Sequence, residues 1–295
     1  MLYQKLKKTF DFVGVINKDR YLKYKPFNYP YETIFVVGLS YPHNVLPTKE
    51  NYLKASVYTY GLDYHKVLKS YLEPFSNDDS LILVDNHNLD EKLCLKLTGL
   101  AYLGKNNLMI NKDYGTFFFI GLLLTKEKYE EIIIENNESC GTCDKCIKAC
   151  PMNALINDYD ESKCLSALNQ KKESLLEMAI KKNYLLLGCD ICQHICPKNQ
   201  NLKESKIKEF IARDHAYVLI DDLFKLSNKE FKDKYGNSAY HFRGKTVLLR
   251  NALTILYNTN NKKYNELIID TINDKKYPLW YKEDAKRILR KLEEE

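Results

Sequence analysis

Cysteine spacing constrains this chain more than any other feature of its 295 residues. Eight of the nine cysteines fall between residues 140 and 196, in two groups with a single cysteine between them. The first group reads C-x2-C-x2-C-x3-C-P and the second reads C-x2-C-x3-C-P. Disulfide frameworks are typical of short secreted chains, and this chain is long and shows no secretion signal. The pattern therefore favours metal or cluster ligation.

The first group has the spacing of a loop that wraps around a [4Fe–4S] cluster. Three thiolates bind one cluster, and the fourth cysteine is carried away to ligate a second. Two clusters then receive four ligands each. Cluster one is expected to take Cys140, Cys143, Cys146 and Cys196. Cluster two is expected to take Cys150, Cys164, Cys189 and Cys192, with Cys164 supplying the ligand that the shorter second group lacks.

Two structural zinc sites built from C-x2-C pairs are the alternative. Four cysteines in one short run closed by Cys-Pro are a more specific sign of clusters, and zinc sites need no interleaved ligands. The ninth cysteine, Cys94, lies on the apolar face of a predicted helix and is expected to be a buried core thiol. Two neighbouring clusters form an electron path, so the rest of the chain must supply the substrate chemistry.

The segments on either side of the cysteines differ in pattern. Residues 1–135 mix strand and helix signals and predict a layered α/β domain, whereas residues 201–295 look helical throughout. Strands are expected over 33–40 and 81–84, helices over 64–72 and 89–98, and a hairpin over 108–124. Further helices are expected over 204–213, 220–224, 229–235, 246–258, 264–272 and 279–292. The predicted fold class is a multidomain α+β protein.

Charge is concentrated near the C-terminus. Residues 198–295 contain 21 Lys and Arg and 15 Asp and Glu, so this third holds the whole net charge of +6. A solvated Lys-rich surface is the commoner cause of such an excess, and a polyanion partner such as RNA is the functional one. No apolar run is long enough for a transmembrane helix, and the N-terminus lacks the apolar stretch of a signal peptide. A cytoplasmic protein without membrane contact is expected.

Several separated stretches resemble motifs of one family, in the family's order. They are Tyr60–His65 ("GRDYH"), Gly99–Asn106 ("GLGWIGKN"), Tyr114–Gly121 (the strand after it), Gly188–Gln193 with Cys196-Pro197 (the second cluster motif), and Leu249–Ala252 (from "LLRNA"). Together they make residues 33–258 similar to epoxyqueuosine reductase, a cobalamin-dependent iron–sulfur family of tRNA modification.

This resemblance implies a nitroreductase-like α/β cobalamin domain over 1–135, a ferredoxin-like double-cluster module over 136–200 and a HEAT-like helical domain over 201–295. The implied reaction removes the epoxide oxygen of epoxyqueuosine in the tRNA anticodon loop and leaves queuosine. It consumes two electrons and two protons and releases water. The implied partners are the tRNA anticodon stem-loop and an external electron donor such as flavodoxin or ferredoxin, and the protein is expected to be a monomer.

Asp85 is the implied proton donor, because it follows the strand expected over 81–84 and matches the family's catalytic Asp. Burial beside the corrin ring is expected to raise the pKa of its carboxyl group. The alternative is a loop Asp that caps the helix beginning at Leu89. His87, two residues further on, is expected to be a surface histidine.

The same resemblance implies cofactor contacts in the α/β domain. Cobalamin contacts are expected at Tyr58, Asp63, Asp85, Gly104, Lys105, Asn106 and Gly121. His65 is not expected to ligate cobalt, because Leu68 stands where the motif D-x-H-x-x-G has its glycine, so cobalamin is expected to bind base-off. Phosphate contacts to tRNA are expected at Arg243, Lys245 and Arg250.

The chain also departs from the family pattern. Tyr102 replaces the Trp of "GLGWIGKN", the arginines of "ARYARGRDYH" are absent from residues 56–62, and the segment before Thr33 is short. These differences leave open a paralogue with another substrate. Two other functions also fit the cysteines: a ferredoxin-like electron carrier, which would bind no corrin, and a cobalamin-dependent reductase of a small molecule, similar to the reductive dehalogenases.

Overall fold

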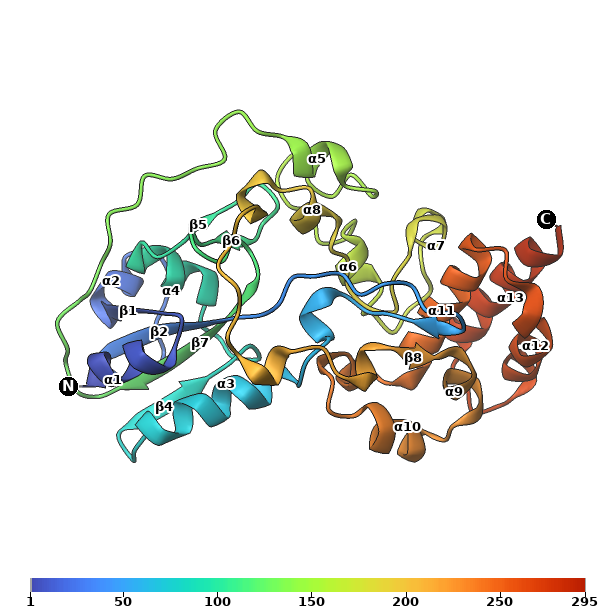
Figure 1. Cartoon of the computed structure of the whole chain (residues 1–295), viewed down its shortest axis with the longest axis horizontal. Helices are drawn as coiled ribbons and strands as arrows, with labels where there is room; N and C mark the ends of the chain where they lie inside the picture. Colours follow the sequence, from blue (N-terminus) through green and yellow to red (C-terminus); the bar gives the residue numbers. More distant parts are fainter. Residues whose placement is uncertain (1, 295) are drawn as a thin grey trace. The chain divides into compact units, whose positions relative to one another are not determined.

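The computed structural model describes residues 2–294, which form two compact units (Figure 1). The first unit comprises the segments up to His43, Leu62–Lys145 and Gln193–Ile211, and the second comprises Asn44–Gly61, Cys146–Cys192 and the segment from Ala212 onward. These units differ from the three consecutive domains expected. The cysteine-rich segment forms no unit of its own, because apolar side chains such as Leu168 and Leu186 join the core of the second unit.

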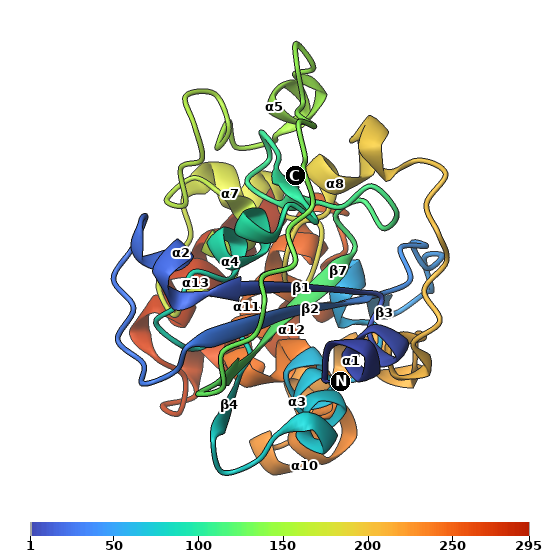
Figure 2. The same cartoon turned by 90° about the vertical axis from the view of Figure 1, so that its left-hand side faces the viewer.

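The first unit is built on a four-stranded antiparallel sheet with the order β1-β2-β7-β4. Its strands are β1 (Phe12–Asn17), β2 (Thr33–Ser40), β7 (Phe118–Thr125) and β4 (Ser80–Leu83). Helix α4 (Glu91–Thr98) packs on β1, β2 and β7, and α3 (Tyr64–Leu72) packs on β7 and β4 from the opposite face (Figure 2). Every residue of β2 is buried, because helices cover both faces of this central strand.

Most expected elements of this unit form. The strand expected over 33–40 and the helix over 64–72 have those bounds, and the strand expected over 81–84 is β4. Helix α4 begins two residues later than expected, because the side chain of Asp90 caps it by accepting from Leu93 N at 2.9 Å. Gly99 ends the helix with φ +74°, as expected. Asp85 is therefore not the helix cap.

The hairpin expected over 108–124 is wrong. Residues 109–110 form β6 (Met109–Ile110), which pairs with β5 (Tyr102–Leu103), whereas β7 joins the main sheet. Only a single bridge connects Asn111 with Gly115. The apolar residues of β7 gain more burial between β2 and β4 than in a two-stranded hairpin, so tertiary packing overrides the local turn signal.

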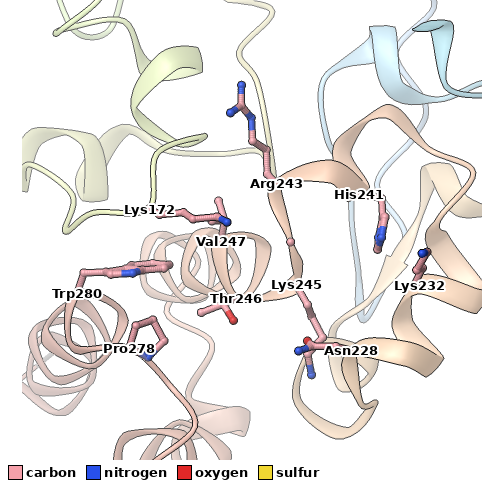
Figure 3. A pocket seen from close by; sticks show the side chains of 11 residues that line it. Lys172, Asn228, Lys232, His241, Arg243, Lys245, Thr246, Val247, Pro278 and Trp280 are labelled. Atoms are coloured by element: carbon pink, nitrogen blue, oxygen red, sulfur yellow. The ribbon is translucent and has the colours of Figure 1, made fainter. Parts of the chain in front are cut away.

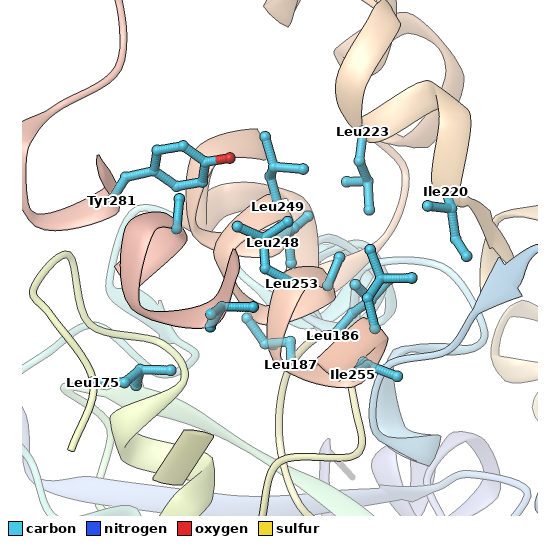
Figure 4. Close-up of a cluster of buried hydrophobic side chains, with 14 of the residues drawn as sticks. Leu175, Leu186, Leu187, Ile220, Leu223, Leu248, Leu249, Leu253, Ile255 and Tyr281 are labelled. Carbon is cyan, nitrogen blue, oxygen red and sulfur yellow. The ribbon is translucent and has the colours of Figure 1, made fainter. Parts of the chain in front are cut away.

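The second unit is mainly helical, with a two-stranded pair of β3 (Tyr52–Leu53) and β8 (Val218–Leu219). Its helices include α6 (Leu165–Leu168), α7 (Glu177–Lys182), α9 (Ile220–Lys225), α10 (Asn228–Tyr235), α11 (Lys245–Asn258), α12 (Asn265–Asn273) and α13 (Leu279–Glu294). Helix α11 packs against α7, α9 and α13 and is buried from Val247 to Leu256. Figure 4 shows its leucines at the centre of the apolar core.

Five of the six helices expected after residue 200 form with bounds close to those expected, as α9 to α13. The helix expected over 204–213 is wrong, because only a short 3-10 turn forms at Lys208–Phe210. This segment instead crosses the first unit as an extended chain. Ser205 Oγ donates to Ser40 O at 2.7 Å, and Tyr71 Oη donates to Glu209 Oε2 at 2.8 Å.

Short helices complete the structure. They are α1 (Leu2–Thr9), α2 (Lys18–Leu22), α5 (Lys145–Ala149) and α8 (Ile191–His194). The last two carry cysteines of the two groups. Within residues 2–294, no helix has the length and apolar composition needed to cross a bilayer.

Candidate functional site

Cysteine thiols lie near one another in each unit. In the first unit, Cys196 lies within electrostatic range of Cys140 and Cys143. In the second unit, Cys192 lies within range of the other three ligands expected for cluster two, Cys150, Cys164 and Cys189, and also of Cys146. The division of ligands between two clusters stays a prediction. Burial raises the pKa of the Cys189 thiol to about 11 and that of Cys192 further. Soft, convergent sulfur donors of this kind suit iron–sulfur clusters.

Within residues 2–294, no disulfide bond joins any of the nine cysteines. Among residues 2–294, no three His, Cys, Asp or Glu side chains converge as ligands of a single metal ion. Thiolates that bind separate irons of one cluster stand farther apart than thiolates that all bind one zinc ion, where each Zn–S distance is ~2.3 Å. Cys94, outside both groups, is fully buried in the core of the first unit, as expected, and burial raises the pKa of its thiol.

The turn Gly104–Asn106 lies beside the first cysteine group. Lys105 Nζ donates to Gly141 O at 2.8 Å and to Cys143 O at 3.0 Å, so this ammonium holds the cysteine loop. A Cβ at Gly104 would lie 2.7 Å from both Asn106 Oδ1 and Ile110 Cδ1, so a larger residue there would displace these side chains. Asn106 is buried, and its Nδ2 has no hydrogen-bond partner among residues 2–294.

Two other expected cobalamin contacts, Gly121 and Tyr58, take part in the packing of their units. A Cβ at Gly121 would lie 3.3 Å from both Leu68 and Leu72, so its missing side chain is explained by the packing of α3 on the sheet. Tyr58 lies in the second unit, in a 3-10 turn packed against the apolar core. A cofactor role for these two positions stays a prediction.

Asp85 occupies a strained loop directly after β4 and Val84. Its φ is +55°, a left-handed conformation that Asp adopts more readily than most residues. Glu91 at the start of α4 fixes this loop by accepting from Asp85 N at 3.0 Å. The side chain of Asp85 is 51% exposed. The loop thus presents a carboxylate to solvent at the end of a strand.

His65 joins two carboxylates in this loop region. Its Nδ1 lies 2.7 Å from Asp63 Oδ1, and its Nε2 lies 2.9 Å from Asp85 Oδ2. Asp63 also caps α3 by accepting from His65 N at 3.1 Å, and Tyr64 Oη donates to Asp85 Oδ2 at 3.2 Å. Because both ring nitrogens face carboxylate oxygens, only the imidazolium form can donate to both.

The ionisation of these groups is coupled. Burial alone would lower the pKa of His65, but hydrogen bonds to Asp63 and Asp85 outweigh it and raise this pKa to about 9. The hydrogen bond from His65 lowers the pKa of Asp85 against the effect of burial. Burial opposes ionisation of Asp63 as well, and His65 again lowers its pKa overall. The expected raised pKa of Asp85 is therefore wrong, because a cationic neighbour outweighs desolvation.

Sequence reasoning missed His65 as a partner of Asp85. A local signal was available. Asp63 and His65 are two residues apart at a helix start, where the carboxylate of an N-cap residue accepts from backbone N–H groups of the first turn. Their meeting with Asp85 depends on α3 packing against β4 and could not be read from spacing. His87 is not the surface histidine expected. Its side chain is 5% exposed, and its Nε2 lies 3.0 Å from Glu91 Oε1.

A basic pocket opens in the second unit, with a volume of about 530 Å³ (Figure 3). The cationic side chains around it come from different segments. They are Lys172, Lys232, Arg243 and Lys245, with His241 and Trp280 nearby. Among residues 2–294, no Asp or Glu lines this pocket. The N-terminus of α11 also faces it through Gly244–Val247, which adds the positive end of the helix dipole.

Two of the three expected phosphate contacts lie in this pocket. Arg243 Nε donates to the neutral Gln170 Oε1 at 3.1 Å, and Lys245 Nζ donates to Leu226 O. Burial lowers the pKa of Lys245.

The third expectation, Arg250, is wrong, because this side chain is fully buried. Its guanidinium donates to three carbonyl groups between α6 and α7, those of Asn169, Lys171 and Glu173, at 2.6–3.1 Å. Arg250 therefore holds the fold and is out of reach of RNA.

Known proteins resemble this chain in sequence and in fold. Residues 139–199 match the model of a 4Fe–4S double cluster binding domain. An epoxyqueuosine reductase of Lactococcus garvieae is 32% identical over 251 residues, which cover 78% of this chain and 70% of that protein. The structure of epoxyqueuosine reductase from Streptococcus thermophilus is 26% identical and matches 100% of this chain and 90% of that one with a TM-score of 0.86.

The fold also matches an epoxyqueuosine reductase solved with an epoxyqueuosine-modified tRNA stem loop. That protein is 24% identical, with a TM-score of 0.87 over 99% of this chain and 89% of the other. The chain therefore has the mixed α/β fold of these oxidoreductases and carries a double [4Fe–4S] cluster domain. The sequence match over most of both proteins establishes that the chain belongs to the epoxyqueuosine reductase family.

Proposed function

We propose that this chain reduces epoxyqueuosine to queuosine in a tRNA anticodon loop, using cobalamin supplied with electrons through its two [4Fe–4S] clusters. The observation that carries the proposal is the contact of a protonated His65 with the half-exposed Asp85. Family membership supports the reaction, and the relative solved with a modified tRNA stem loop supports the substrate. Electrons would come from an external donor such as flavodoxin or ferredoxin.

The reaction requires a proton source at the departing oxygen. Reduction of an epoxide to an alkene breaks two C–O bonds, consumes two electrons and two protons, and releases the oxygen as water. Negative charge that develops on this oxygen must be met by a positioned acid. Asp85 is suited to this task by its exposure at the end of β4.

His65 serves in this proposal as the store of the proton. With its pKa raised to about 9, His65 is protonated at neutral pH, whereas Asp85 is ionised. The resting proton therefore sits on His65 Nε2, 2.9 Å from Asp85 Oδ2. Asp63 holds the opposite ring nitrogen and keeps the ring aligned. As charge develops on the substrate, the proton passes through Asp85 to the oxygen, and His65 becomes neutral.

Residues near the first cysteine group are compatible with cobalamin. Asn106 offers an amide N–H that lacks a partner among residues 2–294, and the corrin ring carries amide groups that could accept from it. Lys105 is committed to the cysteine loop and would act on the cluster ligands rather than the corrin. When bound, cobalamin would supply the strongly reducing cobalt centre that two-electron removal of oxygen requires.

The basic pocket would contact the tRNA backbone. Lys172 and Lys232 are exposed and make no ion pair within residues 2–294, so their ammonium groups are available to phosphates. Arg243 donates from Nε to a neutral amide and lies over the Phe242 ring, and its other N–H groups make no ion pair within residues 2–294. Such contacts fix the position of the RNA and carry no base specificity.

The test is anaerobic reconstitution of the full chain with iron, sulfide and cobalamin. Three quantities are measured: iron content, corrin absorbance after gel filtration, and conversion of epoxyqueuosine in tRNA. The proposal predicts two clusters, bound corrin and conversion to queuosine. Clusters without corrin would favour the electron carrier, and corrin without tRNA conversion would favour a small-molecule reductase. His65→Gln removes the proposed proton store and is expected to lower conversion. His43→Gln, which alters a histidine stacked on Phe117, is the control and should not lower it.

A further inference from the structure

A tyrosine hydroxyl contacts an expected ligand of cluster two. Tyr184 Oη donates to Cys189 Sγ at 3.7 Å. Both residues belong to the second unit. Tyr184 lies outside the cysteine motif, and the proposed reaction does not use it.

The direction of the Tyr184 hydrogen bond is fixed by its other partner. Asp190 N donates to Tyr184 Oη at 2.8 Å, so the phenol oxygen accepts there and its own proton is free to point at sulfur. The Asp190 backbone is itself anchored, because its buried carboxylate accepts from Val57 N at 3.0 Å and from Ser56 Oγ. The hydroxyl is thus held in position by contacts within the protein.

A tyrosine near the first cysteine group makes no such contact. Tyr102 lies within electrostatic range of Cys140 and Cys196 in the first unit. Its buried hydroxyl has no hydrogen-bond partner among residues 2–294. Lys105, beside the same group, donates to backbone carbonyls and not to sulfur.

Hydrogen bonds to the sulfur ligands are among the factors that set cluster potentials. Reduction adds an electron to the cluster and increases the negative charge on its thiolates. A hydroxyl proton aimed at a thiolate therefore stabilises the reduced form more than the oxidised form.

We propose that Tyr184 raises the reduction potential of cluster two by donating a hydrogen bond to Cys189. This makes cluster two easier to reduce than the same cluster without that hydrogen bond. The inference rests on the ligand assignment proposed for cluster two. It concerns electron flow within the chain and is independent of the final substrate.

The test is an EPR-monitored redox titration of the reconstituted full chain. Tyr184→Phe removes one hydroxyl and keeps the ring, and it is expected to lower the midpoint potential of one cluster while the other stays unchanged. Tyr102→Phe is the matched control and should leave the potential of that cluster unchanged. Equal shifts of both clusters, or no shift, would overturn the proposal.

A second measurement needs no variant. ENDOR spectra of the reduced wild-type protein should show an exchangeable proton coupled to one cluster, which disappears in D2O. The absence of this coupling would also overturn the proposal, even if Tyr184→Phe failed to fold. Iron content measured alongside separates loss of a cluster, which would contradict the ligand assignment, from a shift in its potential.

Discussion

Asp85 in the first unit and Arg250 in the second are both charged, yet their surroundings are opposite. Arg250 is fully buried and donates to three backbone carbonyls. Its guanidinium therefore fastens α11 to the segment that precedes α7. Asp85 is half-exposed on a left-handed backbone and faces a histidine that carries a proton.

The comparison distinguishes a charged side chain that stabilises the fold from one that is suited to take part in a reaction. Satisfied buried groups stabilise the fold, and their removal leaves unpaired partners. A strained, half-exposed group beside a protonated neighbour is suited to proton transfer. Substitution of Asp85 should therefore affect turnover, whereas substitution of Arg250 should affect stability.

The largest expected effect is on turnover. Asp85→Asn keeps the side-chain shape and tolerates the left-handed backbone, but it cannot pass a proton as a carboxyl group does. We expect conversion of epoxyqueuosine in tRNA to fall at least ~100-fold, with iron and corrin content unchanged. Asp79→Asn, at an exposed carboxylate paired with Lys126, is the control and should keep full activity. Activity of Asp85→Asn within a few-fold of wild type would remove Asp85 from the proposed role.

Arg250→Met should act on stability instead. The change removes the guanidinium donor from the Lys171 and Glu173 carbonyls and one of two donors from the Asn169 carbonyl, and it removes the packing of a fully buried side chain. We expect the free energy of unfolding to fall by about 3 kcal/mol. Urea unfolding monitored by circular dichroism measures it. Arg243→Met, at a half-exposed pocket position, should cost about 0.5 kcal/mol or less. Similar losses for both variants would show that burial does not distinguish the two arginines.

A pH effect should distinguish the Asp85 site from the rest of the fold. The pKa of His65 is raised from 6.5 to about 9 in the folded chain. Its stabilising contribution is therefore fully present below pH 6.5 and is lost as pH rises through about 9, by up to about 3 kcal/mol. The measurement is the difference in unfolding free energy between wild type and His65→Gln across pH 6–10. A difference that does not change with pH would contradict the raised pKa.

The smallest expected effect concerns the basic pocket. Replacing Lys172 and Lys232 with Gln should weaken binding of a tRNA anticodon stem-loop and reduce the salt dependence of log K by about one for each phosphate group that is no longer neutralised. Lys229→Gln is the matched control, because Lys229 is exposed on the same helix, α10, outside the pocket. An equal loss for both helix positions would indicate a general charge effect and no defined site.

The sequence predicted well those features that depend on local pattern. The spacing of the cysteines predicted the double cluster domain, and apolar periodicity located β2, α3 and helices α9 to α13. Features decided by packing over long distances were missed. The strand β7 left its expected hairpin for the central sheet, and the segment around Glu209 became extended because it pairs with the first unit.

The same division applies to the candidate site. Asp85 was found through a family motif, whereas its partner His65 and its lowered pKa follow from the packing of α3 against β4. Arg250 shows the opposite error, since a charged residue in a family motif was taken for a surface contact and proved to be buried. Charge and motif alone do not reveal which side of a helix faces the core.

The supply of a proton from His65 to Asp85 is tested most directly by NMR titration of the histidine imidazoles in the folded chain, assigned with His65→Gln. We predict that the His65 ring is protonated at pH 7.5 and titrates with a midpoint near 9, and that Asp85→Asn lowers this midpoint. A midpoint near the ordinary value of 6.5 in the wild-type protein would contradict the proposed proton store.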